Sequence, residues 1–482
     1  MLDVLWGVGG MIVILSIAVL LSVDRRKIRV RTVGLALAIQ VLFGVLVLYF
    51  PPGQTALAAV TRGVQAVIDS SAAGIDFLFG PILPEEGSVF AFQVLPVIVF
   101  FAALTAVLYY INVLQWIVKI IGGGLSKLLG TSTPESMNAA ANIFVGQTEA
   151  PLVIRPYIKG MTRSELFAIM VGGLSTVAGS VLVGYSLLGA RLDYLIAASF
   201  MAAPAALLMA KLLVPTGALQ DAEPATVSAG PAQQAGDGTT PAASAASPAH
   251  PLPSGEAGPM RRRGPVGWIL RGGQRGASAE AAAELARRAN VPDETGPDDE
   301  EDGAEVEEPR KPANVIDAAA QGASDGMGLA LNVGAMLIAF ISLIALVNLV
   351  LGVAGGLFGQ EDLTLEVLLG YLFSPIMLAV GVPWAEALDG GSFLGQKIVL
   401  NEFVAFSNFA PQLEEYTAKT QAVVTFALTG FANFASLAIL LGGLGGLAPD
   451  RRSDIARLGL RAVLGGTLAN LMSAAIAGML IG

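Results

Sequence analysis

Eight long apolar stretches constrain this chain more than any other feature, and most of them contain no charged residue. They lie roughly at Leu5–Val23, Val33–Phe50, Val89–Tyr110, Leu166–Leu188, Tyr194–Leu213, Met327–Val353, Ala422–Leu444 and Ile455–Ile481. Each is close to the ~20 residues that a helix needs to cross the hydrocarbon of a bilayer. The chain is 54% hydrophobic and only 14% charged, whereas soluble proteins carry about 25% charged residues. We therefore predict an all-α polytopic membrane protein with eight transmembrane helices.

Three basic loops indicate how these helices are oriented. One follows the first stretch and reads "DRRKIRVR", one precedes the fourth and contains Arg155, Lys159 and Arg163, and one precedes the eighth with Arg451 and Arg452. All three fall on one side if the helices alternate, and the positive-inside rule makes that side the cytoplasm. We expect a multi-pass protein of the cell membrane, the inner membrane of a bacterium, with both termini outside.

Two further apolar segments, roughly Thr133–Ile158 and Pro375–Asn408, do not fit as crossings. The alternation of the basic loops is preserved only if each segment enters and leaves the membrane on the same side. Such re-entrant hairpins occur only where protein buries them or where they line a wet cavity. We predict two re-entrant hairpins in addition to the eight crossings.

Each hairpin places a carboxylate in an apolar run: Glu149 in "VGQTEAP" and Glu402 in "KIVLNEFVAFSNF". Each is followed by a helix with a small, polar interruption, "GGLSTVAGS" at 172–180 and "TGFANFAS" at 429–436. The helices before the two hairpins enter from opposite sides of the membrane in this topology. That order is typical of inverted repeats with broken helices, which build a substrate site near the bilayer midplane.

The residue types in these segments indicate the kind of ligand. An ionised carboxylate at the membrane centre costs ~2.5–3.5 kcal/mol on insertion scales, so it normally faces a cavity or a partner. Uncharged donors and acceptors accompany the two carboxylates: Gln147, Thr148, Asn401, Asn433 and Ser436. No lysine or arginine is adjacent to either glutamate in sequence to meet a phosphate. The composition suits a ligand with hydroxyl groups and ring edges.

Residues 216–312 differ from the rest of the chain. The stretch is rich in Ala, Pro, Ser and Gly, and it carries 16 acidic and 9 basic residues. It cannot bury enough apolar surface to fold, so we predict a disordered cytoplasmic insert. The expected organisation is therefore N-terminal transmembrane helices with an interfacial segment (1–88), a first repeat (89–215), the insert (216–312) and a second repeat (313–482).

Several function classes find no support in the sequence. The chain has no cysteine, and its single histidine, His250, lies in the polar insert. No HExxH, GxSxG or GxxxxGK[ST] motif is present, and these are the signatures of zinc proteases, serine hydrolases and ATP-driven pumps. A membrane-embedded enzyme with Glu149 or Glu402 as a general base is left as an alternative without a supporting motif.

Five motifs together resemble the concentrative nucleoside transporter family. They are "GQTEAPL" (146–152), "STVAGS" (175–180), "GVPWAEAL" (381–388), "KIVLNEFVAF" (397–406) and "GFANFAS" (430–436). The resemblance implies nucleoside uptake in symport with a sodium ion or a proton. It also implies a homotrimer in the lipid bilayer, a scaffold around each mobile transport domain, and no nucleic-acid partner.

The resemblance assigns roles to individual residues. It implies that the nucleobase contacts Gln147, Thr148 and Glu149, with Val181 packing against it. It implies that the ribose hydroxyls are held by Glu402, Asn433 and Ser436, beside Phe431. It implies a sodium site at Asn142, Val145, Thr176 and Val177, with the valines acting through their carbonyl groups.

We expect a sodium-driven nucleoside symporter and no enzymatic activity. Proton coupling remains the main alternative, since a glutamate can carry the proton. A transporter-like nucleoside sensor that signals through the insert is a further alternative.

Overall fold

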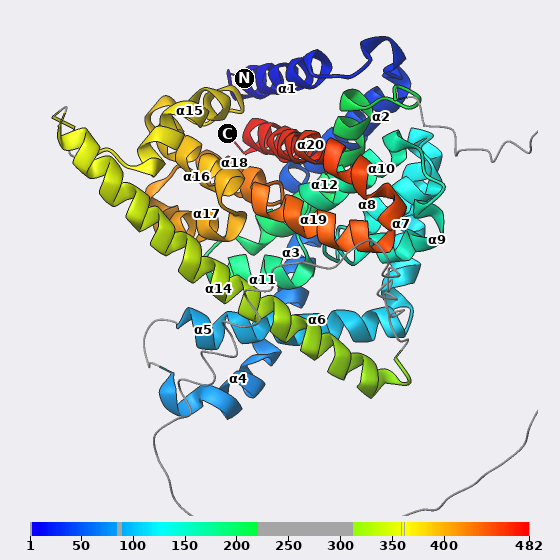
Figure 1. The fold of residues 1–482 in the computed structure, drawn as a ribbon, viewed down its shortest axis with the longest axis horizontal. Helices are drawn as coiled ribbons and strands as arrows, with labels where there is room; N and C mark the ends of the chain where they lie inside the picture. Colours follow the sequence, from blue (N-terminus) through cyan, green and yellow to red (C-terminus); the bar gives the residue numbers. More distant parts are fainter. Residues whose placement is uncertain (1, 84–88, 220–311, 358, 361, 482) are drawn as a thin grey trace, which may run out of the picture. The chain divides into compact units, whose positions relative to one another are not determined.

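All regular secondary structure is helical in the residues that the structure, a computed structural model, describes: 2–83, 89–219, 312–357, 359–360 and 362–481 (Figure 1). The all-α prediction is confirmed. The predicted insert falls almost entirely outside the described residues, and the described part of the chain belongs to one compact unit.

The N-terminal segment contains two apolar helices followed by two helices that were not predicted individually. Their bounds are α1 (Leu2–Leu20), α2 (Val30–Gly44, continued by a π-helical turn at Val45–Tyr49), α3 (Pro51–Ser70) and α4 (Ala72–Phe79). Helix α3 starts at a proline pair, because proline lacks the N–H that would remain unpaired in a first turn anyway.

The rest of the chain contains the same series of elements twice, as an inverted repeat requires. The first series is α5 (Phe90–Gln93) and α6 (Leu95–Tyr110), α7 (Val113–Leu129), α8 (Thr133–Ala141), a 3₁₀ turn (Ala150–Ile154) with α9 (Arg155–Ile158), α10 (Arg163–Ser175), α11 (Gly179–Leu187) and α12 (Leu192–Leu213). The second series is α14 (Val315–Gly356), α15 (Leu365–Ala379), α16 (Ala387–Val399), α17 (Glu402–Phe409), α18 (Ala418–Leu428), α19 (Phe434–Leu447) and α20 (Arg452–Leu480).

Both re-entrant hairpins are present, and one of them has a corrected start. Hairpin 1 consists of α8, the turn after it, and the 3₁₀ turn with α9, which matches the predicted Thr133–Ile158. Hairpin 2 consists of α16 and α17 and starts at Ala387 instead of the predicted Pro375. Pro375 lies inside α15, a helix that packs along α16. No charged residue occurs between Pro375 and Ala385, so the sequence did not mark the end of α15.

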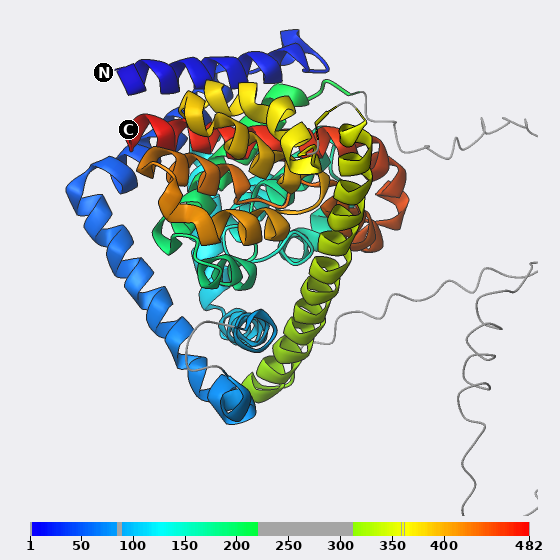
Figure 2. The ribbon, with the colours of Figure 1, turned by 90° about the vertical axis from the view of Figure 1, so that its left-hand side faces the viewer.

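Seven helical segments among the described residues are long and apolar enough to cross a membrane. The predicted crossing Ala422–Leu444 is not one of them, because it is divided into α18 and α19. In the segments of α10–α11 and of α12, 94% of the most apolar window is buried, against 11% in α14. The first two therefore lie inside the bundle, whereas α14 presents most of its apolar surface outward. Figure 2 shows α14 and α3 on opposite sides of the bundle.

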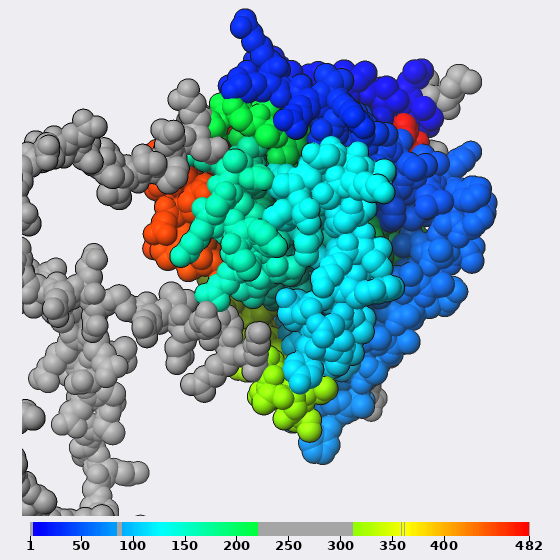
Figure 3. All heavy atoms as spheres, turned by 90° about the vertical axis from the view of Figure 1, so that its right-hand side faces the viewer, coloured from blue at the N-terminus to red at the C-terminus, as the bar shows by residue number. Residues whose placement is uncertain are grey.

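Helices α6 and α14 cross in close contact (Figure 1). A Cβ atom added at Gly322 would lie 2.5 Å from the Ala106 Cβ, and one added at Gly326 would lie 2.6 Å from the Ala102 Cβ. Small residues spaced four apart allow two helices in lipid to approach this closely. On another face, α7 and the segments after it lie side by side, in cyan and teal in Figure 3.

Candidate substrate and ion site

The tip of hairpin 1 is the non-helical stretch between α8 and the 3₁₀ turn. The Gly146 N–H donates to the Glu149 carboxylate at 3.4 Å, and the Glu149 N–H donates to the Gly146 carbonyl at 3.1 Å. Pro151, which has no N–H, then starts the returning turn. These local contacts close the tip, and the Glu149 side chain remains exposed.

The two residues before Glu149 contact other helices. Gln147 is buried, and a Cβ added at Gly173 of α10 would lie 2.8 Å from its Cβ. Thr148 is half-buried, and a Cβ added at Gly443 of α19 would lie 2.7 Å from its Cγ2. Hairpin 1 therefore rests on a broken helix of each repeat, and glycine makes both contacts possible.

The two broken helices meet at their interruptions. The Phe431 N–H, between α18 and α19, donates to the Thr176 carbonyl, between α10 and α11, at 3.1 Å. Asn470 of α20 donates to the Ser175 and Thr429 carbonyls, both at 2.7 Å. Backbone groups released by the interruptions are thus paired within the protein, as the membrane interior demands. The contacts bring the two predicted half-sites together.

Glu402 is the buried carboxylate of hairpin 2. Its side chain is 5% exposed; Oε1 accepts a hydrogen bond from the Tyr185 hydroxyl at 2.9 Å, and Oε2 accepts one from Asn433 Nδ2 at 2.7 Å. It occupies the first position of α17, where the positive end of the helix dipole favours a negative charge. The carboxylate is therefore held by donors from both repeats.

Asparagine side chains cap the N-termini of the two helices around Glu402. The Asn401 Oδ1 accepts from the Val404 N–H at 2.9 Å and caps α17, and the Asn433 Oδ1 accepts from the Ser436 N–H at 2.7 Å and caps α19. Asparagine is among the preferred capping residues because its oxygen pairs with a free N–H of the first turn. Asn433 therefore caps a half-helix with its oxygen and holds Glu402 with its nitrogen.

The four residues of the predicted sodium site are buried and lie in two segments that touch. The Gly179 N–H donates to the Phe144 carbonyl at 3.1 Å, which joins the hairpin 1 tip to the α10–α11 interruption. The buried Asn142 Oδ1 has no hydrogen-bond partner among the described residues. Thr176 Oγ1 donates to the Gly172 carbonyl at 3.0 Å, so its lone pairs remain available. Val145 and Val177 lie in non-helical turns. This oxygen-rich set fits a hard monovalent cation.

The last two predicted site residues, Val181 and Phe431, lie at or next to the two helix interruptions. Val181 is buried on the first turn of α11, one helical turn before Tyr185. Phe431 is partly buried at the α18–α19 interruption. The individual contacts of both residues with a ligand remain predictions.

Three residues of the site were missed from the sequence: Tyr185, Lys397 and Asn470. The available signal was a polar side chain inside an apolar run, "VGYSLL", "GQKIVL" and "TLANLMS". Lys397 Nζ donates to the Ala427 carbonyl at 2.7 Å and to Asn470 Oδ1 at 2.8 Å. Their hydrogen-bond partners lie far away in sequence. The pattern therefore marked these residues as unusual but did not indicate what they contact.

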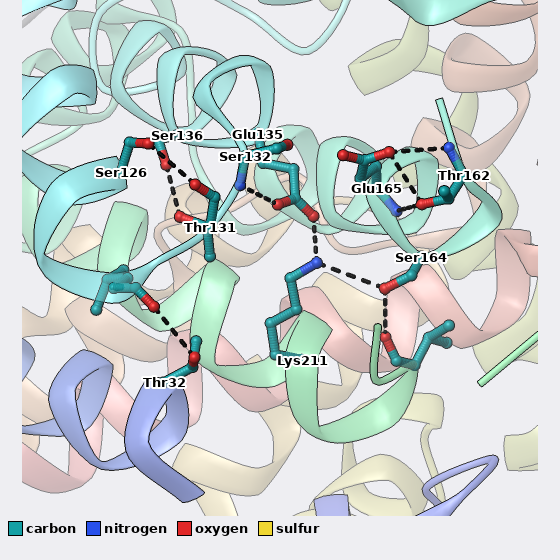
Figure 4. Close-up of polar contacts among 12 residues, drawn as sticks. Thr32, Ser126, Thr131, Ser132, Glu135, Ser136, Thr162, Ser164, Glu165 and Lys211 are labelled. Carbon is teal, nitrogen blue, oxygen red and sulfur yellow. Dashed lines mark hydrogen bonds and ion pairs between the residues drawn. The ribbon is translucent and has the colours of Figure 1, made fainter. Parts of the chain in front are cut away.

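The base of hairpin 1 is fastened by a buried ion pair (Figure 4). Lys211, near the end of α12, pairs with the Glu135 carboxylate on α8, and both side chains are less than 10% exposed. Glu135 also accepts from the Ser132 N–H at 2.9 Å, and Lys211 donates to Ser164 Oγ at 3.4 Å. The charges of hairpin 1 are therefore paired at its base, at the opposite end from Glu149.

Family models match most of the chain. Residues 9–82 match the N-terminus of Na+ dependent nucleoside transporters, residues 91–191 match a nucleoside-recognition gate, and residues 281–478 match the C-terminus of Na+ dependent nucleoside transporters. The resemblance thus extends to the N-terminal helices. It also reaches into the stretch predicted as an insert, since the last match begins at residue 281.

Relatives match over the full length. The uncharacterized transporter YutK of Bacillus subtilis is 49% identical, covering 100% of both chains. The nucleoside permease NupC of Helicobacter pylori is 41% identical, covering 99% of this chain and 98% of its own. Human solute carrier family 28 member 3 is 32% identical, covering 98% of this chain and 59% of its own.

Solved structures agree with this fold. CNTnw in an inward-facing, substrate-bound state has a TM-score of 0.78 at 46% identity, covering 99% of this chain and 98% of its own. A doubly substituted CNTnw in an outward-facing state has a TM-score of 0.79 at 45% identity, covering 100% and 98%. On these motifs, family models and relatives, the chain belongs to the concentrative nucleoside transporter family, whose members are transporters and not enzymes.

Proposed function

We propose that this protein is a secondary active symporter that imports nucleosides and that an inward sodium gradient drives it. The observation that carries the proposal is the meeting of the two half-sites through the hydrogen bond from Phe431 to Thr176. Around that bond lie the buried Glu402 carboxylate, each of whose oxygens accepts a hydrogen bond, and the oxygens of the predicted sodium site. Family membership supports the same function.

The substrate contacts divide between the two hairpins. Glu402, Asn433 and Ser436 would hold the ribose hydroxyls beside Phe431, because the two carboxylate oxygens can accept from two neighbouring hydroxyl groups. Gln147, Thr148 and Glu149 would contact the nucleobase edge, with Val181 packing against the ring. The Gln147 Oε1, which is buried without a partner among the described residues, is available to accept from a base or a water.

The coupling ion would bind between the hairpin 1 tip and the α10–α11 interruption, in contact with Asn142, Val145, Thr176 and Val177. The ion is cargo that moves with the nucleoside. The buried Asn142 oxygen without a partner supports a cation there, because such an oxygen is costly unless something binds it.

Contacts among the basic loops support the proposed orientation. Arg451 donates to the Met161 carbonyl at 2.5 Å, and Arg163 pairs with Asp454 at 2.9 Å, so the loops before α10 and α20 touch. Lys27 donates to the Gly217 carbonyl at 2.5 Å, which joins the first basic loop to the first residues of the predicted insert. We propose that this side is cytoplasmic, that both termini lie outside, and that the protein is a homotrimer in a bacterial inner membrane.

Uptake of radiolabelled uridine and adenosine into proteoliposomes tests the function, with sodium and proton gradients imposed separately. We expect accumulation with the sodium gradient alone. Asn142→Ala should raise the sodium concentration for half-maximal uptake about tenfold or more, since a lost ligand to a charged group costs ~1.5–3 kcal/mol. Its uridine binding at saturating sodium serves as the folding control.

The alternatives give different results in the same assay. Uptake that is independent of sodium and follows an inward proton gradient would show that the coupling ion is a proton and not sodium. Uridine binding without counterflow would indicate a sensor. Single cysteines introduced into the loops, in a chain that has none, report the orientation through impermeant thiol reagents, and light scattering with size exclusion reports the number of protomers.

A further inference from the structure

Lys397 is a fully buried cation that the proposed transport function does not use. It lies on α16 near the tip of hairpin 2, and its side chain is 0% exposed. Its ammonium group donates to the Ala427 carbonyl at 2.7 Å and to Asn470 Oδ1 at 2.8 Å. A buried charge is tolerated only with partners of this kind, so the position of the ammonium is specific.

The ammonium replaces a missing backbone donor at the end of a broken helix. In an uninterrupted helix the Phe431 N–H would pair with the Ala427 carbonyl, four residues earlier. Here the Phe431 N–H donates instead to the Thr176 carbonyl of the other repeat. The Ala427 carbonyl therefore belongs to the negative end of α18, where a cation is favoured, and Lys397 supplies that cation.

The corresponding place in the first repeat is the proposed sodium site. Helix α10 ends at Ser175 as α18 ends at Leu428, and a threonine follows each. Both threonine hydroxyls donate to the carbonyl four residues earlier, Thr176 at 3.0 Å and Thr429 at 2.7 Å. The tip of the preceding hairpin approaches the helix end in both repeats, with Asn142 in the first and Lys397 in the second.

The amide oxygens of the two repeats differ in a way that matches this correspondence. In the first repeat, three buried amide oxygens have no partner among the described residues: those of Asn138, Asn142 and Gln147. In the second repeat, the amide oxygens around the tip of hairpin 2 and the α18–α19 interruption are paired. The acceptors Gln396, Asn401, Asn433 and Asn470 bind Asn408, Val404, Ser436 and Lys397, respectively. The tip of hairpin 1 lacks a cation such as the one that Lys397 supplies near the tip of hairpin 2.

We infer that Lys397 is a tethered cation that fills, in the second repeat, the place of the coupling ion in the first, so that one sodium ion accompanies each nucleoside. The inference rests on the proposed sodium coupling. Glu402 is buried three residues after the end of α16, so the tip region of hairpin 2 contains a cation and an anion of its own. The tip of hairpin 1 has Glu149 and takes up its cation from solution, whereas Lys211 is paired with Glu135 at the hairpin base.

The unmodified protein gives the first test. Simultaneous uptake of radiolabelled sodium and uridine should give a ratio of one, and uridine binding should depend on sodium with a Hill coefficient of one. A flux ratio of two would overturn the inference while leaving sodium-driven transport intact. Uptake independent of sodium would instead overturn the proposed function, so the two failures are distinguishable.

Removal of the ammonium gives the second test. Lys397→Ala opens space at the Ala427 and Asn470 oxygens, and we expect uridine affinity to fall at least tenfold and to recover several-fold with millimolar methylammonium. The Hill coefficient for sodium should rise above one if sodium enters the same space. Lys397→Met fills the space without charge and should show no rescue.

Two controls separate this role from general stabilisation. Lys419→Ala removes a lysine at the start of α18, at the opposite end of that helix from the site, where it pairs with Asp3 at 2.6 Å; it should leave the sodium dependence unchanged. Asn142→Ala should respond to higher sodium and not to methylammonium. If Lys397→Ala lost affinity and no small cation restored it, Lys397 would have a purely structural role and the inference would be overturned. If the variant does not fold, the flux ratio of the unmodified protein decides between the two outcomes.

Discussion

The two hairpins have the same place in their repeats but opposite distributions of charge. Hairpin 1 has its buried ion pair at its base, through Glu135 and Lys211 of α12. Its tip carries an exposed Glu149 and amide oxygens that have no partner in the described part of the chain. Hairpin 2 carries Lys397 and Glu402 near its tip, both buried and each with two hydrogen bonds to the protein. The tip of hairpin 2 is preorganised by protein hydrogen bonds, whereas the tip of hairpin 1 is completed by the ion and the nucleoside that we propose it binds.

The difference shows how a duplicated framework can divide two tasks. A preorganised carboxylate suits the recognition of ribose hydroxyls, because the ordering cost has been met before the ligand arrives. An incomplete tip suits coupling, because the ion and the nucleoside then order the same segment and each favours the binding of the other. Four substitutions test this comparison.

The largest effect is expected at the base of hairpin 1. Glu135→Gln leaves the Lys211 ammonium buried without its carboxylate, and breaking a buried pair in this way costs about 3–5 kcal/mol of folding free energy. The double variant Glu135→Gln/Lys211→Met should recover most of the loss, since no unpaired charge remains. Thermal unfolding of the purified protein is the measurement. Asp3→Asn, at a pair whose carboxylate is 46% exposed, should change stability by less than 1 kcal/mol. A stable single variant would show that the base is not fastened by this pair.

The second effect concerns the preorganised tip. Glu402→Gln trades one acceptor oxygen for a donor and removes the charge, and a hydrogen bond to a charged group contributes ~1.5–3 kcal/mol. Uridine affinity measured by calorimetry should fall roughly 10- to 100-fold. The 2′,3′-dideoxy analogue should lose less, because it lacks the 2′- and 3′-hydroxyl groups that would donate hydrogen bonds to Glu402.

Tyr185→Phe is the matched control for Glu402→Gln. It removes one donor to the carboxylate and keeps the ring stacked on Phe406 at 4.4 Å. We expect it to affect both ligands to a similar, smaller extent. If Glu402→Gln left the difference between uridine and its dideoxy analogue unchanged, Glu402 would not be the ribose acceptor.

A smaller effect is expected where hairpin 1 rests on α19. In Gly443→Ala the new methyl group would lie 2.7 Å from the Thr148 Cγ2, and overpacking of this kind costs about 1 kcal/mol when the neighbour can move. Uridine affinity should fall several-fold as Thr148 is displaced. Gly442→Ala meets nothing within 4 Å and should bind normally. Equal affinities for the two variants would argue that the tip of hairpin 1 is not in contact with α19 when the ligand is bound.

The smallest effect is expected at Glu149. Its carboxylate is exposed and makes one long contact, 3.4 Å to the Gly146 N–H, so Glu149→Gln should leave folding stability within about 0.5 kcal/mol of the original. We expect affinities for uridine and adenosine to change by different, few-fold amounts, as competition binding would measure. A uniform change for all nucleosides would place Glu149 away from the base.

Most of the apolar segments were predictable because length and hydropathy alone determine which segments can cross a bilayer; the division of Ala422–Leu444 into α18 and α19 removed one predicted crossing. The sequence singled out the two glutamates on a related ground, since a carboxylate in an apolar run requires a partner or a cavity; their roles in substrate binding stay predictions. Family membership was predictable from the five motifs and is confirmed by the family models. The broken helices followed from their small, polar interruptions, and the structure interrupts them at those segments.

The partners of the charged groups were not predictable. Tyr185 and Glu402 are 217 residues apart, and Lys397 and Asn470 are 73 residues apart. Such contacts depend on how the repeats pack, which no local pattern encodes. Helices α7 and α15 were missed as separate elements for another reason. They are shorter than a crossing, and each continues almost directly into a hairpin.

The length of α14 has a consequence for the surrounding lipid. Its 42 residues span about 63 Å at 1.5 Å per residue, roughly twice the ~30 Å of the hydrocarbon layer. Its most apolar part, predicted as Met327–Val353, would fit that thickness only at a tilt of roughly 40° from the membrane normal, at the upper end of the tilts seen for such helices. A thicker bilayer would favour a more upright α14. Because α14 is locked to α6 through Gly322 and Gly326, changes in acyl-chain length would act on both helices together.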